Sequence, residues 1–168
     1  MRIWIASVGA RARDAFEELA EMYVGRMRPL LPGGKSAVEA PVFRSEQALR
    51  EAVEKERARA APLLVLLDER GKQMESEAFA EWLGREMDGG RQLIVFAVGP
   101  ADGWGTARGA GGTGRGGSKA EGPGSSEDMR LSLGKMTMAH ELARVVLCEQ
   151  VYRALTILKG HPYHRGWR

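Results

Sequence analysis

The chain of 168 residues has a single cysteine, Cys148, so it cannot form an internal disulfide. A disulfide scaffold is therefore excluded, and a lone cysteine on the apolar face of a predicted helix is typical of proteins from reducing compartments. Catalytic thiols need an electropositive and accessible setting. We expect Cys148 to be an inert core residue.

Long apolar runs are also missing, and no stretch approaches the ~20 apolar residues that span a membrane. The apolar segment 3–8 is shorter than the roughly 7 to 15 residues of a signal-peptide core. Arg11 and Arg13 follow it directly. We expect a soluble intracellular protein that has neither a signal peptide nor a membrane anchor.

Complete phosphate-binding motifs are absent as well. Gly134 and Lys135 do not end a P-loop, because no glycine lies five residues earlier and Met136 replaces the required Ser or Thr. A formal GxGxxG at 112–117 neither follows a predicted strand nor opens a predicted helix. A nicotinamide-dependent oxidoreductase remains an alternative, which this misplaced motif opposes.

Apolar runs that alternate with helical periodicity are present along most of the chain. They predict strands at residues 3–8, 38–43, 63–67, 93–98 and 131–133. Helices are predicted at 12–30, 45–60, 76–87 and 142–158. This alternation indicates an α/β fold with an open, mostly parallel sheet, in a single domain over residues 1–168.

Local signals refine these elements. Ser45 and Ser76 are predicted N-caps, and Gly160 is a predicted helix stop beyond which Pro162 prevents continuation. Pro41 favours an edge strand. The apolar stripe of the first helix is expected to face the core: Ala12, Phe16, Leu19, Met22 or Tyr23, Met27 and Leu30.

Ligands of open parallel sheets bind beyond the carboxyl ends of the strands. That rule nominates Leu67, Gly99 and the loop after Leu133 as a binding site, with residues 68–72 as a loop beside it. The last helix is apolar over more than the ~100° stripe that one core contact requires, which suggests a second partner. We expect a charge at Val151 to disrupt that contact.

Glycine is concentrated in one segment: eleven of the 22 glycines lie between residues 99 and 124, without apolar periodicity. We expect a flexible insertion at about 104–128.

Positive charge is concentrated elsewhere. The formal net charge of +3 divides into +5 over residues 130–168 and −2 over the rest. An anionic partner such as RNA is therefore expected at the C-terminal end.

Three motifs near the C-terminus carry a family resemblance: GKMTMAH at 134–140, RVVLCEQVYRA at 144–154 and HPYHR at 161–165. They resemble the ribosomal RNA large subunit methyltransferase H family, which belongs to the SPOUT superfamily. LLVLLDERGK at 63–72 and VGPADG at 98–103 fall where that family has similar segments. The resemblance covers the whole chain apart from the glycine-rich insertion.

The resemblance implies a C-terminal trefoil knot, a homodimer with the last helix at its interface, and a site for S-adenosylmethionine without any metal. It implies methyl transfer to N3 of a pseudouridine in large-subunit ribosomal RNA within the ribosome, in bacterial cytoplasm or plastid stroma. The implied cofactor-binding residues are Leu67, Gly99, Leu133, Gly134, Lys135, Met136, Thr137 and Met138. The implied catalytic residues are His140, Arg153, Tyr163, His164 and Arg165.

Two positions depart from the family pattern. Pro100 replaces a glycine and removes one backbone donor, and Ala139 replaces a proline that commonly precedes the histidine. A non-catalytic ribosome-binding relative that has lost the cofactor is therefore a further alternative.

Overall fold

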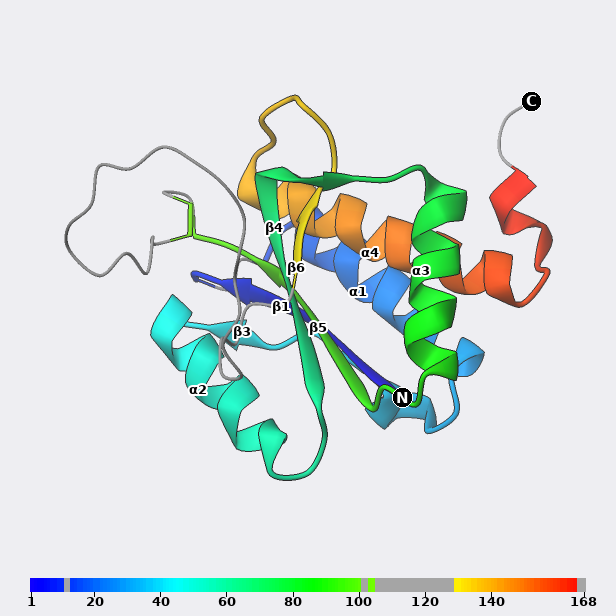
Figure 1. Cartoon of the computed structure of the whole chain (residues 1–168). Helices are drawn as coiled ribbons and strands as arrows, with labels where there is room; N and C mark the ends of the chain where they lie inside the picture. Colours follow the sequence, from blue (N-terminus) through cyan, green and yellow to red (C-terminus); the bar gives the residue numbers. More distant parts are fainter. Residues whose placement is uncertain (11–12, 101–102, 105–128, 166–168) are drawn as a thin grey trace, which may run out of the picture.

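The computed structural model describes residues 1–10, 13–100, 103–104 and 129–165, without the side chains of residues 164 and 165. Figure 1 shows a twisted sheet with helices on both of its faces. The glycine-rich insertion, with the formal GxGxxG, lies outside the described residues.

Six strands form one sheet in which every pairing is parallel. The order is β2-β1-β5-β4-β6, and β3 also pairs with β1. The strands are β1 (Arg2–Val8), β2 (Val38–Glu39), β3 (Val42–Phe43), β4 (Pro62–Gln73), β5 (Leu93–Val98) and β6 (Met129–Ser132). The expected open parallel α/β sheet is thus confirmed. Pro41 interrupts the edge strand, which is consistent with its missing amide hydrogen.

Four α-helices cover the sheet: α1 (Ala15–Met27), α2 (Glu46–Arg57), α3 (Ser76–Asp88) and α4 (His140–Leu158). Helices α1, α3 and α4 pack on one face and α2 packs alone on the other (Figure 1). Helix α4 lies between α1 and α3. Three short 3-10 helices complete the described chain: η1 (Arg28–Leu30), η2 (Gly34–Ala37) and η3 (Pro162–Arg165).

Helix ends follow the local chemistry in most places. Ser45 caps α2 as predicted, accepting a hydrogen bond from the amide of Ala48 at 3.2 Å. Gly160 has φ 65° directly after α4, which confirms the predicted left-handed stop. The predicted cap at Ser76 is wrong: Glu75 occupies the N-cap, and the Ser76 hydroxyl donates instead to Gln150 of α4 at 2.8 Å.

The prediction for the inner face of α1 is wrong for three residues. Phe16, Leu19 and Met22 are exposed, whereas Ala20, Val24 and Met27 are buried against the sheet. The helix carries two apolar stripes, and the sequence pattern alone does not say which one meets the sheet.

The expectation for Val151 is also wrong. Its side chain is fully buried in the core beneath α4, so it cannot form part of an outer contact. The exposed apolar residues of α4 are Leu142 and Leu158 near its two ends.

Candidate functional site

A cavity of about 620 Å³ lies at the carboxyl ends of β4, β5 and β6. Its walls come from the bulged part of β4, the loop after β5 and the segment from β6 to the first turn of α4. This is the position at which open parallel sheets bind their ligands. Its volume falls within the roughly 300–1,000 Å³ of small-molecule and cofactor sites.

The first wall is a break in the register of β4. Leu67 and Lys72 both pair with Leu131 of β6, so residues 68–71 bulge out of the ladder. The expected loop at 68–72 is therefore a bulge within a longer strand. Gly71 returns the strand to β6 so closely that a Cβ there would lie 2.6 Å from the carbonyl carbon of Leu131. Only glycine fits this approach.

An ion pair closes the same wall. Arg130 of β6 donates to the carboxylate of Asp68, and the amide of Arg70 donates to the same side chain at 2.9 Å. The Arg70 amide, followed by Arg130, lowers the pKa of Asp68 below its ordinary value. Asp68 is therefore an anion at neutral pH, held at the edge of the cavity.

The second wall is a tight turn after β5. The amide of Gly103 donates to the carbonyl of Pro100 at 2.8 Å, and Gly103 has φ 78°. The indole Nε1 of Trp104 donates to the carbonyl of Leu67 at 2.6 Å. A Cβ on Gly99 would lie 2.8 Å from the Trp104 ring, so Gly99 makes room for it. Pro100 is thus accommodated, because the turn uses its carbonyl and not an amide.

The third wall is the segment between β6 and α4. The Ser132 hydroxyl donates to the carbonyl of Gly134 at 2.9 Å and accepts from its amide at 3.2 Å. Gly134 has φ 148°, a value that favours glycine. Ala139 has φ −58°, which proline also adopts, so the departure from the family pattern leaves the backbone unchanged.

The structure brings together most of the implied cofactor residues. Seven of the eight line the cavity, and the exposed Lys135 does not. The seven are Leu67, Gly99, Leu133, Gly134, Met136, Thr137 and Met138. The Asp68–Arg130 pair and Trp104 also line it and were missed, because their partners are distant in the sequence.

The implied catalytic residues do not come together within one chain. His140 lines the cavity at the start of α4. Arg153 lies 13 residues further along the same helix, about 20 Å away at roughly 1.5 Å per residue, and Tyr163 packs beside it. The side chains of His164 and Arg165 lie outside the described structure.

A buried ion pair supports the cavity end of α4. Arg144 and Glu17 of α1 are paired and are only 7% and 8% exposed. Nε and Nη2 of Arg144, and Nε2 of His140, are buried without a hydrogen-bond partner among the described residues. The pair ties α1 to α4 one turn below His140.

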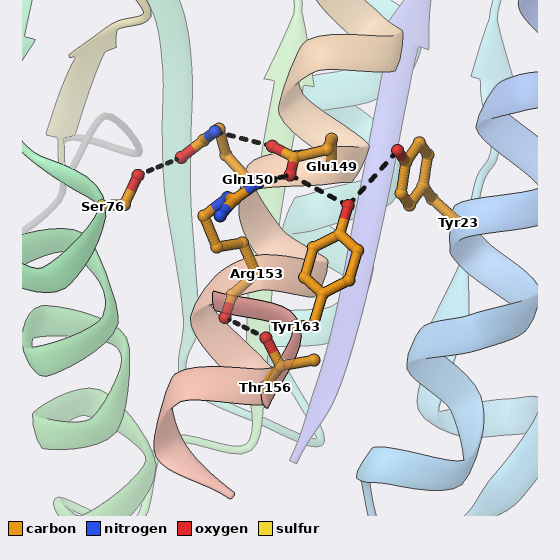
Figure 2. Close-up of polar contacts among 7 residues, drawn as sticks. All are labelled: Tyr23, Ser76, Glu149, Gln150, Arg153, Thr156 and Tyr163. Carbon is orange, nitrogen blue, oxygen red and sulfur yellow. Dashed lines mark hydrogen bonds and ion pairs between the residues drawn. The ribbon is translucent and has the colours of Figure 1, made fainter. Parts of the chain in front are cut away.

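A second polar cluster begins at the middle of α4 and extends toward its C-terminal end (Figure 2). Its centre is Glu149, which accepts hydrogen bonds from Arg153, Tyr163 and Gln150. Sequence reasoning missed Glu149. The spacing of Glu149 and Arg153, four residues apart on a helix, was the available signal for an ion pair.

The remaining groups suggest no other chemistry. Burial raises the pKa of Cys148 to about 12, which agrees with the expected inert thiol. No cluster of three or more His, Cys, Asp or Glu suited to a metal ion occurs among the described residues. None of the described helices combines the length and the apolar character that a membrane crossing requires.

The parallel sheet and its cavity agree with a SPOUT-type α/β methyltransferase. A family model described as a predicted SPOUT methyltransferase matches residues 1–110 and 114–164. A Koribacter versatilis (strain Ellin345) protein named ribosomal RNA large subunit methyltransferase H is 41% identical over 166 residues, 99% of each chain. The chain belongs to the ribosomal RNA large subunit methyltransferase H family, as its motifs predicted.

Two further relatives agree with this assignment. Proteins of the same name from Rhizobium meliloti (strain 1021) and Sinorhizobium medicae (strain WSM419) are 37% and 39% identical over 175 residues. Those alignments cover 99% of this chain and 100% of each relative. A crystal structure of the SpoU methyltransferase AviRb from Streptomyces viridochromogenes with AdoMet has a TM-score of 0.46 and 13% identity, covering 93% of this chain and 58% of that one.

Proposed function

We propose that this methyltransferase moves a methyl group from S-adenosylmethionine to N3 of a pseudouridine in large-subunit ribosomal RNA. The observation that carries the proposal is the cavity at the ends of β4, β5 and β6, which seven implied cofactor residues line. The names of the relatives support the ribosomal RNA substrate.

The cavity suits S-adenosylmethionine in its chemistry. It offers apolar cover from Leu67, Leu133 and Met138 for the adenine ring, and loop backbone that ring nitrogens and ribose hydroxyls can approach. Asp68 at its edge balances the charge of Arg130, so this pair adds no net positive charge against a ligand that carries a positive sulfonium. When bound, S-adenosylmethionine supplies an activated methyl group on that sulfonium.

The chain's own residues must then orient the base and remove a proton from N3. During the transfer, the bond between the sulfonium sulfur and the methyl carbon breaks, a bond between N3 and that carbon forms, and the N3 proton leaves. The position of His140 in the cavity lining supports a role for its side chain in accepting that proton. A cation near the base would stabilise the N3 anion, a role that Arg165 of the tail is proposed to fill.

A second copy of the chain would complete the site. The tail and His140 lie at opposite ends of α4, so one chain does not bring them together. Four large apolar side chains are exposed on the neighbouring helices α1 and α4: Phe16, Leu19, Met22 and Leu142. A homodimer that covers these residues would place the tail of one copy near the cavity of the other. The proposed C-terminal knot and a cytoplasmic or plastid location accompany this assignment.

Calorimetric titration of the protein with S-adenosylmethionine tests the proposal. We expect binding, followed by transfer of a labelled methyl group to a pseudouridine in ribosomal particles, with sedimentation indicating a dimer. The alternative of a ribosome-binding relative without cofactor predicts particle binding and no heat of S-adenosylmethionine binding. That result would overturn the proposal.

A further inference from the structure

The carboxylate of Glu149 receives an unusual number of hydrogen bonds for one side chain on the outer part of a helix. Its Oε1 accepts from Nε of Arg153 at 2.9 Å, from Nη2 of Arg153 at 2.6 Å and from the hydroxyl of Tyr163 at 3.1 Å. Its Oε2 accepts from Nε2 of Gln150 at 2.6 Å. Both oxygens are therefore occupied, and the carboxylate has one orientation (Figure 2).

Residues from two other helices support this arrangement. The Ser76 hydroxyl of α3 donates to Oε1 of Gln150 at 2.8 Å, which leaves the amide nitrogen of Gln150 facing Glu149. On the other side, the Tyr23 hydroxyl of α1 lies 3.5 Å from the Tyr163 hydroxyl. The cluster thus spans α1, α3, α4 and η3 (Figure 2).

Arg153 is held inside this cluster. Its guanidinium is paired with Glu149, which raises the pKa of Arg153, and it lies 5.1 Å from the centre of the Tyr163 ring. The Tyr152 ring also packs against the Tyr163 ring, and the two ring centres are 4.7 Å apart. The charge of Arg153 is therefore already compensated, and its contacts are with the tail.

Burial also raises the pKa of the Tyr163 hydroxyl, so the group is a neutral donor at physiological pH. A neutral hydroxyl can donate to Glu149 and still accept from Tyr23. The hydrogen bonds thus set the direction of the ring and, through it, the path of the chain at residues 162–165.

We propose that Glu149 is the positioning residue of the C-terminal tail, and that Arg153 acts with it as a clamp on Tyr163 and not as a cation at the substrate. The inference rests on the proposed function, because the tail is assigned there to the methyl-transfer site. It concerns positioning alone: Glu149 acts through Tyr163 and need not touch the substrate.

Glu149→Ala, assayed with saturating ribosomal substrate, is the first test. We expect kcat to fall by roughly 10- to 100-fold, the loss that follows when reacting groups are misplaced by about 1 Å. The Kd for S-adenosylmethionine and the KM for the substrate should change by less than about threefold, because Glu149 lies about 14 Å along α4 from His140 at the cavity and does not line it. Glu77→Ala, which removes an exposed carboxylate beside Ser76, is the matched control and should behave as wild type.

Glu149→Gln is the conservative variant. A glutamine oxygen can still accept from Tyr163 and Arg153, and Gln150 can turn its amide because the Ser76 hydroxyl can also accept. We expect kcat to recover to within about fivefold of wild type. The hydrogen bonds remain in this variant, and only the extra strength that the negative charge of Glu149 gives them is lost. A merely destabilising role predicts no such recovery of kcat at a temperature where both variants are folded.

A double-mutant cycle with Arg153→Ala separates the clamp from a catalytic cation. If both residues act through Tyr163, the double variant should be no slower than the worse single variant. If the double variant instead loses kcat by the product of the two single-variant factors, Arg153 acts on the substrate itself, and the proposal is overturned. Wild-type kcat in Glu149→Ala would overturn it as well.

Hydrogen exchange of the C-terminal peptide gives a readout that does not depend on activity. We expect the amides near Tyr163 to exchange faster in Glu149→Ala than in wild type or in Glu149→Gln. If wild-type protein lacks methyl transfer while this exchange pattern holds, the proposed function fails and the clamp stands. If methyl transfer occurs but exchange is unchanged in Glu149→Ala, the clamp alone fails.

Discussion

The two ends of α4 differ in what surrounds them. At the start of the helix, His140 borders a large cavity walled by backbone, glycines and apolar side chains. From the middle of the helix onward, Glu149, Arg153 and Tyr163 form a polar cluster, and the pocket that the neighbouring Gln150 lines is smaller, at about 190 Å³. One end is built to receive a ligand, and the other is built to hold a segment of chain.

The difference indicates a division of labour along one rigid element. A helix of 19 residues fixes the distance between its ends, so the tail of the same chain stays about 20 Å from the cavity while it is docked. Cofactor binding and tail positioning should then respond to separate substitutions. The following predictions test that separation, beginning with the largest expected effect.

Truncation after Gly160 removes the tail and leaves the helix stop in place. We expect methyl transfer to be lost, because the residues proposed to act on the base are gone, while S-adenosylmethionine affinity stays within about threefold. Single-turnover methylation measures the first quantity and calorimetry the second. A truncated protein that still reacts at the wild-type single-turnover rate would remove the tail from the active site.

Val151→Lys tests the buried face of α4 beside the Glu149–Arg153 pair. The side chain is fully buried, so an unpaired charge there should cost about 3–5 kcal/mol of unfolding free energy, measured by urea denaturation. Leu142→Lys is the contrasting variant, because Leu142 is 40% exposed. It should remain folded and sediment as a monomer. A folded, monomeric Val151→Lys protein would contradict this placement of the core.

Gly71→Ala alters the cavity end alone. The added Cβ would meet the backbone of β6, so we expect a loss of about 1–3 kcal/mol in stability and weaker S-adenosylmethionine binding. The matched control is Gly25→Ala, at an exposed position of α1 where nothing lies within 4 Å of the new Cβ. It should gain about 0.5–1 kcal/mol, because alanine favours a helix interior. Amide exchange near Tyr163 should be unchanged in both variants. Altered exchange there in Gly71→Ala would show that the cavity and the tail cluster are coupled.

Asp68→Asn has the smallest expected effect and depends on pH. The folded-state pKa of Asp68 is lowered, so its contribution to stability is fully present above the ordinary value of 3.8 and is lost as pH falls through the folded-state value. Wild type should therefore have the higher Tm at pH 7, and the difference should shrink below pH ~4. A difference that is constant from pH 7 to strongly acidic pH would argue against an ionised Asp68.

Much of the cavity end was predictable from the sequence, and little of the tail end was. The segments that line the cavity follow strands that apolar runs mark clearly, so the places of Leu67, Gly99 and Gly134 in its lining were predictable from their position after these strands. The bulge at 68–71 was not predictable from the sequence, because a break in register depends on the neighbouring strand β6. The tail cluster joins residues from three α-helices and η3, and only the spacing of Glu149 and Arg153 indicated part of it.

By itself, the sequence determined the alternation of strands and helices, the stop at Gly160, the family, and the loops that line the cavity. These follow from short-range patterns that each segment carries within it. Only the tertiary structure decided which stripe of α1 is buried, which partner Ser76 binds, and how far Arg153 lies from His140. Each of those depends on which element distant in the sequence packs against the segment, and the amphipathic pattern of a segment does not predict that element.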